Sequence, residues 1–228
     1  MMKKVIAMMM VAGMATASAN LVITEVMSNS DNPGGPGNGD WFELYNSGGS
    51  NVDLNGYYWD DDANGTDQPS IFPNVSIAAG GTLLVVDENS GNTVDWEDTV
   101  WDIDEVASAT VVSKDEFSGD DDFSGLSAGG DAIYVWDGDP TDSGSLVASV
   151  TFGDSDGGGK TFEWDSNGTS LGFSVAGENG AFTCPNDGDG GTPGVDVGSP
   201  GYVVVIPEPA TLSLLALLGA ALIGRRRR

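Results

Sequence analysis

The sequence WFELYN at residues 41–46 decides the fold class, because its side chains alternate in character. Successive side chains of a β-strand point to opposite faces of the sheet. We therefore expect one face of this strand to pack into a hydrophobic core and the other face to point away from that core. The expected core residues are Phe42 and Leu44, and the opposite face holds Trp41, Glu43 and Tyr45.

Runs of the same kind recur along the chain, separated by clusters of Gly, Asn, Asp, Ser and Pro. None of the segments between them shows a convincing helical period. With the 34 glycines of the chain, this spacing predicts an all-β fold, an antiparallel β-sandwich. In the run at 82–86 we expect Leu84 and Val86 to face the core. Further strands are predicted at residues 21–27, 57–59, 75–77, 132–136, 146–152 and 161–164.

Residues 87–122 interrupt this rhythm with 13 acidic residues and one lysine in 36 positions. The segment is too long for a hairpin turn and too acidic for a core. We expect an insertion between strands, partly ordered where Trp96, Trp101 and Phe117 pack on the sandwich. Residues 183–201 are rich in Gly, Pro and Asp, which predicts a closing loop followed by a linker.

The first 19 residues have the organisation of a secretory signal peptide. Lys3 and Lys4 precede an apolar stretch that runs from Val5 to Met14. The small residues Ala17 and Ala19 then form the A-x-A cleavage pattern. The sequence therefore predicts an exported chain whose mature form starts at residue 20.

The other end carries an apolar run at residues 210–224, followed by the cluster Arg225–Arg228. This run predicts a short hydrophobic helix with the arginines on the cytoplasmic side of a membrane. Its 15 residues, at about 1.5 Å each, reach roughly 22 Å against a hydrocarbon core of about 30 Å. We expect a short single-pass anchor, supported by snorkelling arginines or local thinning of the bilayer.

The region between the two ends is strongly acidic. It keeps only Lys114 and Lys160 against 34 acidic residues, a net charge of −32. Nucleic acid is excluded as a partner, because binding it requires cations that displace phosphate counterions. Divalent cations are the expected counterions for such a surface, although adaptation to a salty habitat would explain the charge equally well.

Two residue types limit the chemistry further. The chain contains no histidine, which excludes Ser-His-Asp triads and removes the commonest general base. Cys184 is the only cysteine, so no disulfide can form within the chain. Pairs of carboxylates could perform glycoside hydrolysis, but in so acidic a chain such pairs arise by chance.

A partial calcium motif follows the predicted strand at 57–59. Alternate oxygen-bearing side chains before a glycine begin an EF-hand loop, in which they converge on one ion. The position that should supply the closing glutamate is Ile71, and Asp67 could take that role instead. The alternative is a solvated acidic turn. The predicted calcium ligands are Asp60, Asp62, Asn64 and Asp67.

Several phrases, in order, resemble the lamin tail domain, an immunoglobulin-like β-sandwich that also occurs in exported bacterial proteins. Residues 52–57, VDLNGY, resemble a signature of that family, with Tyr57 in place of its tryptophan. The acidic segment at 87–122 departs from the family pattern. The other matching phrases lie at residues 21–27, 40–46, 72–73, 77–86, 123–135, 150–153 and 191–194.

The C-terminus resembles the PEP-CTERM sorting signal of Gram-negative bacteria. Residues 206–211 read IPEPAT and contain its Pro207-Glu208-Pro209 core, followed by the apolar run and the arginine cluster. The resemblance implies processing by an exosortase and an association with exopolysaccharide or biofilm matrix.

These observations divide the chain into a signal peptide (1–19), a lamin-tail-like sandwich (20–201) and a sorting signal (202–228). We expect a non-enzymatic structural or binding protein of the cell surface or extracellular matrix. Its expected partners are an exosortase, exopolysaccharide, divalent cations and other matrix proteins. The alternatives are a calcium-binding adhesion module and a carboxylate-based hydrolase that acts on matrix polysaccharide.

Overall fold

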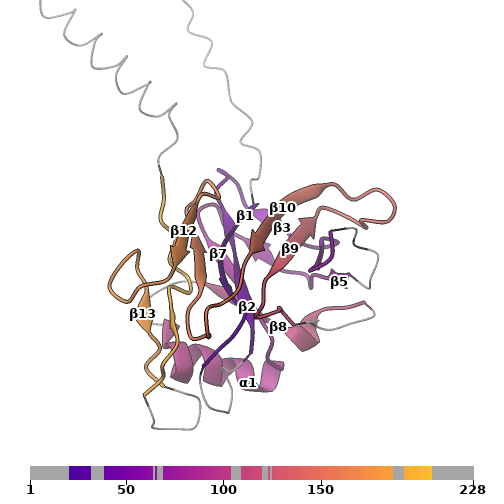
Figure 1. The fold of residues 1–228 in the computed structure, drawn as a ribbon. Helices are drawn as coiled ribbons and strands as arrows, with labels where there is room; N and C mark the ends of the chain where they lie inside the picture. The colour runs from indigo at the N-terminus through magenta and orange to yellow at the C-terminus, as the bar shows by residue number, and fades with distance from the viewer. Residues whose placement is uncertain are drawn as a thin grey trace, which may run out of the picture.

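The computed structural model describes residues 21–31, 39–63, 65, 69–103, 109–119, 123, 125–186 and 193–206. These residues form two packed β-sheets, and a short helical segment lies against the larger one (Figure 1). The predicted signal peptide and the predicted C-terminal helix lie outside the described residues. Within the described ranges, no helix is long and apolar enough to cross a membrane.

The larger sheet has six strands in the order β12-β11-β1-β2-β7-β8. Its central strands β1 and β2 are the two N-terminal runs of the sequence, paired antiparallel with Val26 opposite Phe42. The bounds are β12 (Ser170–Phe173), β11 (Phe162–Trp164), β1 (Leu21–Met27), β2 (Trp41–Asn46), β7 (Thr82–Val86) and β8 (Thr110–Ser113).

The smaller sheet has four strands in the order β10-β9-β4-β5, and two short strand pairs complete the fold. Its bounds are β10 (Leu146–Phe152), β9 (Asp131–Trp136), β4 (Tyr58–Asp60) and β5 (Ser70–Ile71). The pairs are β3 (Val52–Asp53) with β6 (Ser76–Ile77), and β13 (Phe182–Thr183) with β14 (Val197–Gly198). The predicted all-β sandwich is confirmed.

The main core lies between the two sheets. From β2 it receives Phe42 and Leu44, as the alternation predicts, and both side chains are fully buried. Phe42 packs on Trp59 of the smaller sheet, with a ring-centroid distance of 4.9 Å. This aromatic pair joins the centres of the two sheets.

The prediction for β7 was wrong by one residue. Leu83 and Val85 face the main core, whereas Leu84 and Val86 lie on the opposite face of the sheet. The register with β2, which pairs Phe42 with Val85, sets this orientation. All five side chains of β7 are buried, including its one polar residue, Thr82, and residues 83–86 are apolar throughout, so this run does not alternate in a way that reveals the period.

The acidic insertion covers the outer face of the six-stranded sheet with a second core. Its helix α1 (Ser90–Asp95) continues into a π-helical turn at Trp96–Trp101. Trp96 and Trp101 pack edge-on against Trp41 of β2, with ring-centroid distances of 5.8 and 5.6 Å. The expected ordering by aromatic packing is confirmed, while the helix itself was not predicted.

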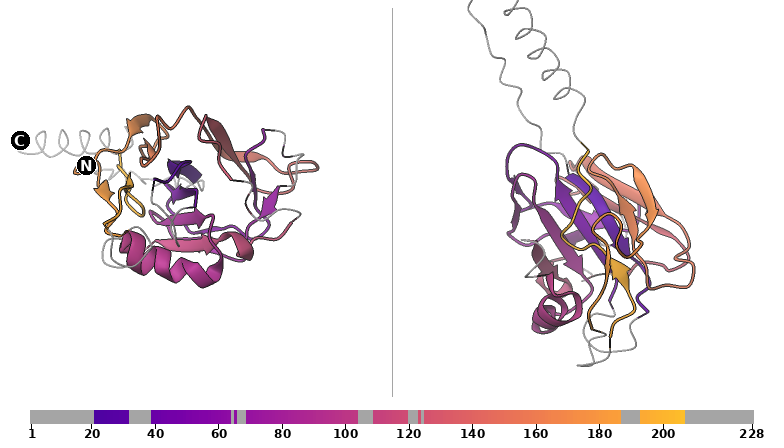
Figure 2. Two further views of the ribbon diagram at one scale, coloured as in Figure 1. Left: turned by 60° about the horizontal axis from the view of Figure 1, so that its bottom comes forward. Right: turned by 90° about the vertical axis from the view of Figure 1, so that its left-hand side faces the viewer.

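The insertion also contributes an edge strand. After the helical segment, β8 returns parallel to β7, which is an exception to the antiparallel pattern. A parallel pair needs a crossover connection, and the helical segment supplies it. The helical segment and β8 lie along one border of the domain (Figure 2). Phe117, which follows β8 in the chain, packs in the main core, with its ring centroid 5.2 Å from that of Phe72.

Residues 196–206, here called the C-terminal strap, extend across the outer face of the six-stranded sheet. In the right-hand view of Figure 2 the yellow strap passes in front of the indigo N-terminal strands. Backbone bonds from Thr161 to Val197 and from Ser166 to Val204 attach it along its length. Residues 193–201, the described later part of the segment predicted as a loop and linker, are therefore an integral part of the domain.

Candidate functional site

Two predicted sites lie outside the described residues. They are the sorting core Pro207, Glu208 and Pro209, and the cleavage residues Ala17 and Ala19. The described chain begins at Leu21 and ends at Ile206, at the same end of the sandwich (Figure 1). The Ile206 amide donates to Ser166 Oγ at 2.8 Å, so the domain holds the chain up to the sorting motif.

The predicted calcium loop starts at the end of β4. Asp60 is buried, its Oδ1 accepts the Asp62 amide at 3.2 Å, and its Oδ2 has no hydrogen-bond partner among the described residues. Burial raises the pKa of Asp60 to about 6. Asn64 and Asp67 lie outside the described residues. In the described part of the chain, no three acidic or thiol side chains gather in a group that could hold a metal ion.

Three glutamates form a row across the outer face of the six-stranded sheet, here called the glutamate row. Glu25 of β1 lies directly opposite Glu43 of β2 on one side and opposite Glu163 of β11 on the other. Their side chains are 0–3% exposed. A β-bulge between Ile23 and Glu25 sets this register. Three acidic side chains thus lie beneath the C-terminal strap.

Glu25 is the central member of the row and binds the strap directly. Its Oε1 accepts the backbone amide of Ser199 and the hydroxyl of Thr161, each at 2.6 Å. Its Oε2 is buried and has no hydrogen-bond partner among the described residues. A buried carboxyl oxygen without a donor is unfavourable when charged.

Glu43 joins the strap to β1. Its Oε2 accepts the backbone amide of Gly201, and its Oε1 accepts the hydroxyl of Thr24, each at 2.6 Å. Glu163, at the other end of the row, accepts longer bonds of 3.3 Å from Ser199 Oγ and 3.2 Å from Asn179 Nδ2. All three carboxyl groups therefore act as hydrogen-bond acceptors that position the strap.

Burial dominates the electrostatics of the glutamate row. It raises the pKa of Glu43 to about 8, against the hydrogen bonds from Thr24 and Gly201, which favour the charged form. Burial, and then the charge of Glu43, raise the pKa of Glu25 well above its ordinary value. Burial also raises the pKa of Glu163. At neutral pH Glu43 therefore retains a proton that an ordinary glutamate releases.

The sequence contains only part of the signal for this row. Alternation places Glu43 on the face opposite the core, but it does not show that the strap, about 160 residues later, covers that face. Glu25 and Glu163 were not predicted as a site. The available signal is an acidic residue inside each of three strand-like runs; Glu43 and Glu163 have apolar neighbours on both sides, and Glu25 follows Thr24.

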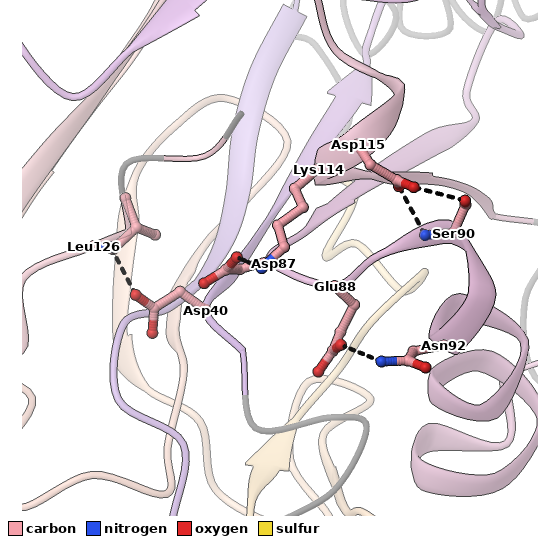
Figure 3. Close-up of polar contacts among 8 residues, drawn as sticks. All are labelled: Asp40, Asp87, Glu88, Ser90, Asn92, Lys114, Asp115 and Leu126. Atoms are coloured by element: carbon pink, nitrogen blue, oxygen red, sulfur yellow. Dashed lines mark hydrogen bonds and ion pairs between the residues drawn. The ribbon is translucent and has the colours of Figure 1, made fainter. Parts of the chain in front are cut away.

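A second polar cluster joins the start of the acidic insertion to its later part (Figure 3). Lys114 forms an ion pair with Asp87 at 2.8 Å, and Asp115 accepts the amide and hydroxyl of Ser90. The Ser90 bonds lower the pKa of Asp115. Nearby, Asp40 accepts the amide of Leu126 at 2.6 Å, and burial raises its pKa to about 6. These contacts anchor both ends of the insertion.

Two hollows lie near the end of the sandwich where the described chain begins and ends. One, of about 300 Å³, lies between β1 and β10 and is lined by residues 21–23 and 147–150 with Trp164, Asn167 and Gly168. The other, of about 530 Å³, is lined by Asn179, Gly180 and residues 202–205. Neither lining contains an acidic or basic side chain, so neither hollow offers a pair of carboxylates for hydrolysis.

Comparison with known families gives two matches. Residues 14–154 match the Lamin Tail Domain, and residues 205–228 match the PEP-CTERM protein-sorting motif. No curated protein and no solved structure matches the chain. The first match ends soon after β10. Beyond it, β11 and β12 complete the six-stranded sheet, and the strap covers the glutamate row.

Proposed function

We propose a structural or binding role outside the cytoplasm for this chain, which belongs to the lamin tail domain family. Its PEP-CTERM motif indicates an exported, envelope-associated protein that an exosortase recognises. The finer proposal is that the mature domain is a non-enzymatic component of the cell surface or extracellular matrix. Exopolysaccharide and other matrix proteins are its proposed partners.

One observation carries the non-enzymatic role: the buried carboxyl groups with the most perturbed environment support the fold. Glu25 and Glu43 bind the strap through Ser199 and Gly201, and their side chains are at most 1% exposed. General acids and bases must reach the proton that they transfer. The glutamate row is therefore better suited to fixing the strap than to acting on an external substrate.

The charge of the domain restricts its partners. A net charge of −32 repels acidic polysaccharides over about 10 Å at 0.1 M salt. Binding to an acidic matrix polymer would require bridging by divalent cations, whereas a neutral polymer would bind without them. The proposed matrix role therefore predicts different calcium dependence for the two polymer classes.

Calcium binding at the Asp60 loop is a second proposal, and Asp60 itself favours it. Its buried Oδ2 lacks a hydrogen-bond partner among the described residues, and a cation would neutralise and coordinate it. Asp62 is adjacent, and Asn64 and Asp67 are the further proposed ligands. This site would make the domain a calcium-binding adhesion module within the same extracellular role.

The experiment uses exopolysaccharide purified from the producing cells. The mature protein is sedimented with it in calcium and in EDTA, and released sugar reducing ends are measured in the same samples. Co-sedimentation without release of reducing ends supports the matrix role. Sustained release that substitution of a single acidic residue abolishes would instead establish the hydrolase alternative. A protein that neither binds the polysaccharide nor releases reducing ends would contradict both roles.

A further inference from the structure

The end of the six-stranded sheet at which the described chain begins and ends is here called the tail end. It consists of the start of β1, the loops 46–51, 78–81 and 165–169, and the last residues of the strap. Asn46 connects two of the loops, because its side-chain amide donates to the carbonyls of Ser50 and Ala78. Ser166 connects the third loop to the strap through Val204 and Ile206.

The loops and strap residues of the tail end carry no exposed charge, in a domain that is otherwise densely acidic. The nearest exposed acids in the described chain are Asp53, two residues beyond the loop 46–51, and Glu178, in the turn that packs beside Tyr202. The loops 46–51, 78–81 and 166–169 and the strap residues 197–206 contain no Asp, Glu, Lys or Arg. Asp165 is the one acidic residue within these bounds, and it is buried, with its carboxylate bound to the amides of Asn167 and Thr169.

The opposite end of the same sheet is acidic. Its turns carry Asp31, Asp40, Asp87, Glu88 and Asp115 beside the start of the insertion. β1 alone has seven residues at about 3.3 Å each, so the two ends are separated by roughly 20 Å. The smaller sheet differs: its hairpin 137–145, between β9 and β10, carries Asp137, Asp139 and Asp142 and extends sideways at the same end of the domain as the tail end (Figure 1).

The last residues of the strap are exposed and apolar. Tyr202, Val205 and Ile206 are 51%, 59% and 42% exposed. Ile206 is still hydrogen-bonded to Ser166, and only residues 207–209 separate it from the apolar run that starts at Ala210. From Ile206 to Ala210 the chain takes four residue steps, which reach at most about 14 Å when fully extended. Any surface that holds residues 210–224 therefore begins within about 14 Å of Ile206.

We propose that the tail end is the face that this domain turns toward a phospholipid bilayer while residues 210–224 hold the chain there. Anionic lipid headgroups repel acidic side chains within a Debye length, about 8–10 Å at moderate salt. The tail end places neutral loops at this distance and keeps the acidic turns of the six-stranded sheet about twice as far away. Tyr202 has the amphipathic ring that suits a membrane interface.

This inference rests on the expected single-pass anchor at residues 210–224, here called the membrane-tethered stage, and the test separates the two. The full chain, in a Cys184→Ala background, is reconstituted in vesicles of phosphatidylethanolamine and phosphatidylglycerol. Single exposed positions are changed to cysteine and labelled with a fluorophore: Ser50→Cys and Asn167→Cys at the tail end, and Ala128→Cys at the acidic end. Lipids with a quencher on the headgroup report how close each label is to the bilayer.

We expect several-fold stronger quenching at positions 50 and 167 than at position 128. Equal quenching at all three positions, in protein that floats with the vesicles, overturns the orientation and leaves the tether intact. Protein that does not float with the vesicles contradicts the tethered stage itself, and the orientation is then overturned with it.

A charge variant provides an independent arm of the test. Asn167→Asp with Thr169→Asp adds two acids at the tail end, and Ser127→Asp with Ala128→Asp adds two at the opposite end. With the label at Ser50→Cys, the first pair should weaken quenching on phosphatidylglycerol vesicles, and the effect should fade in phosphatidylcholine or high salt. If the second pair weakens quenching equally, the reasoning from local charge is wrong.

Discussion

Replacing Glu43 by glutamine tests the electrostatics of the glutamate row. Glutamine has nearly the same shape but stays neutral at every pH. Its carbonyl oxygen can accept the Gly201 amide, and its amino group can donate to the Thr24 hydroxyl oxygen. Both contacts of Glu43 therefore have a replacement in Glu43→Gln.

The magnitude follows from the pKa of Glu43, which is about 8 in the folded domain against an ordinary 4.5. Because the folded state holds this proton more tightly, its contribution to stability is complete below about pH 4.5. It is lost as the pH rises to about 8. One pKa unit corresponds to about 1.4 kcal/mol, so the loss amounts to at most about 5 kcal/mol. The total free energy of unfolding of an ordinary domain is only about 5–15 kcal/mol.

The assay is urea unfolding from pH 5 to 9 at constant ionic strength, followed by tryptophan fluorescence. Wild type should lose stability steadily across this window, and Glu43→Gln should lose several kcal/mol less. Glu25 and Glu163 titrate in both proteins, so the difference between the two curves reports Glu43 together with its electrostatic coupling to Glu25. Glu178→Gln, at an exposed residue, is the matched control and should change stability by less than about 0.5 kcal/mol. Parallel curves for wild type and Glu43→Gln would refute the reasoning.

Three further predictions use the same unfolding measurement. Trp101→Ala should lower the free energy of unfolding by about 3–5 kcal/mol, because Trp101 is fully buried against Trp41. Trp101→Phe, which removes an indole N–H without a described partner, should lower it clearly less. Equal losses for the two variants would contradict this packing. Thr161→Val should lower the free energy of unfolding by about 1–3 kcal/mol, because it removes a hydrogen-bond donor to Glu25. An unchanged free energy of unfolding would mean that this bond does not stabilise the fold. Millimolar CaCl₂ should raise the melting temperature of the wild type more than NaCl or MgCl₂ at the same ionic strength. The double variant Asp60→Ala, Asp62→Ala should lose this additional increase. If the three salts act equally on the wild type and the double variant, the loop is a solvated turn.

Local patterns in the sequence were sufficient to predict the sandwich. The alternation at 41–46 placed Phe42 and Leu44 in the core because that strand carries polar Glu43 between apolar residues. The run at 82–86 contains no such marker, and its orientation depends on pairing with β2. Its register was therefore beyond reach from the sequence alone.

The glutamate row and the helical cover depend on contacts between distant parts of the chain. The Ser199 amide reaches Glu25 across 174 residues, and no local pattern encodes this contact. Helix α1 has only six residues and forms where Trp96 and Trp101 pack on Trp41. Helices this short gain their stability from tertiary packing rather than from propensity. The calcium loop stays a prediction, because two of its four proposed ligands lie outside the described residues.

The intact mass of the protein isolated from cells that carry an exosortase tests the central claim most directly. An exported and sorted chain should start near Asn20 and lack Arg225–Arg228. The same protein from cells without the exosortase should keep the arginine cluster while still lacking residues 1–19. A protein that retains both ends in exosortase-positive cells would contradict the account.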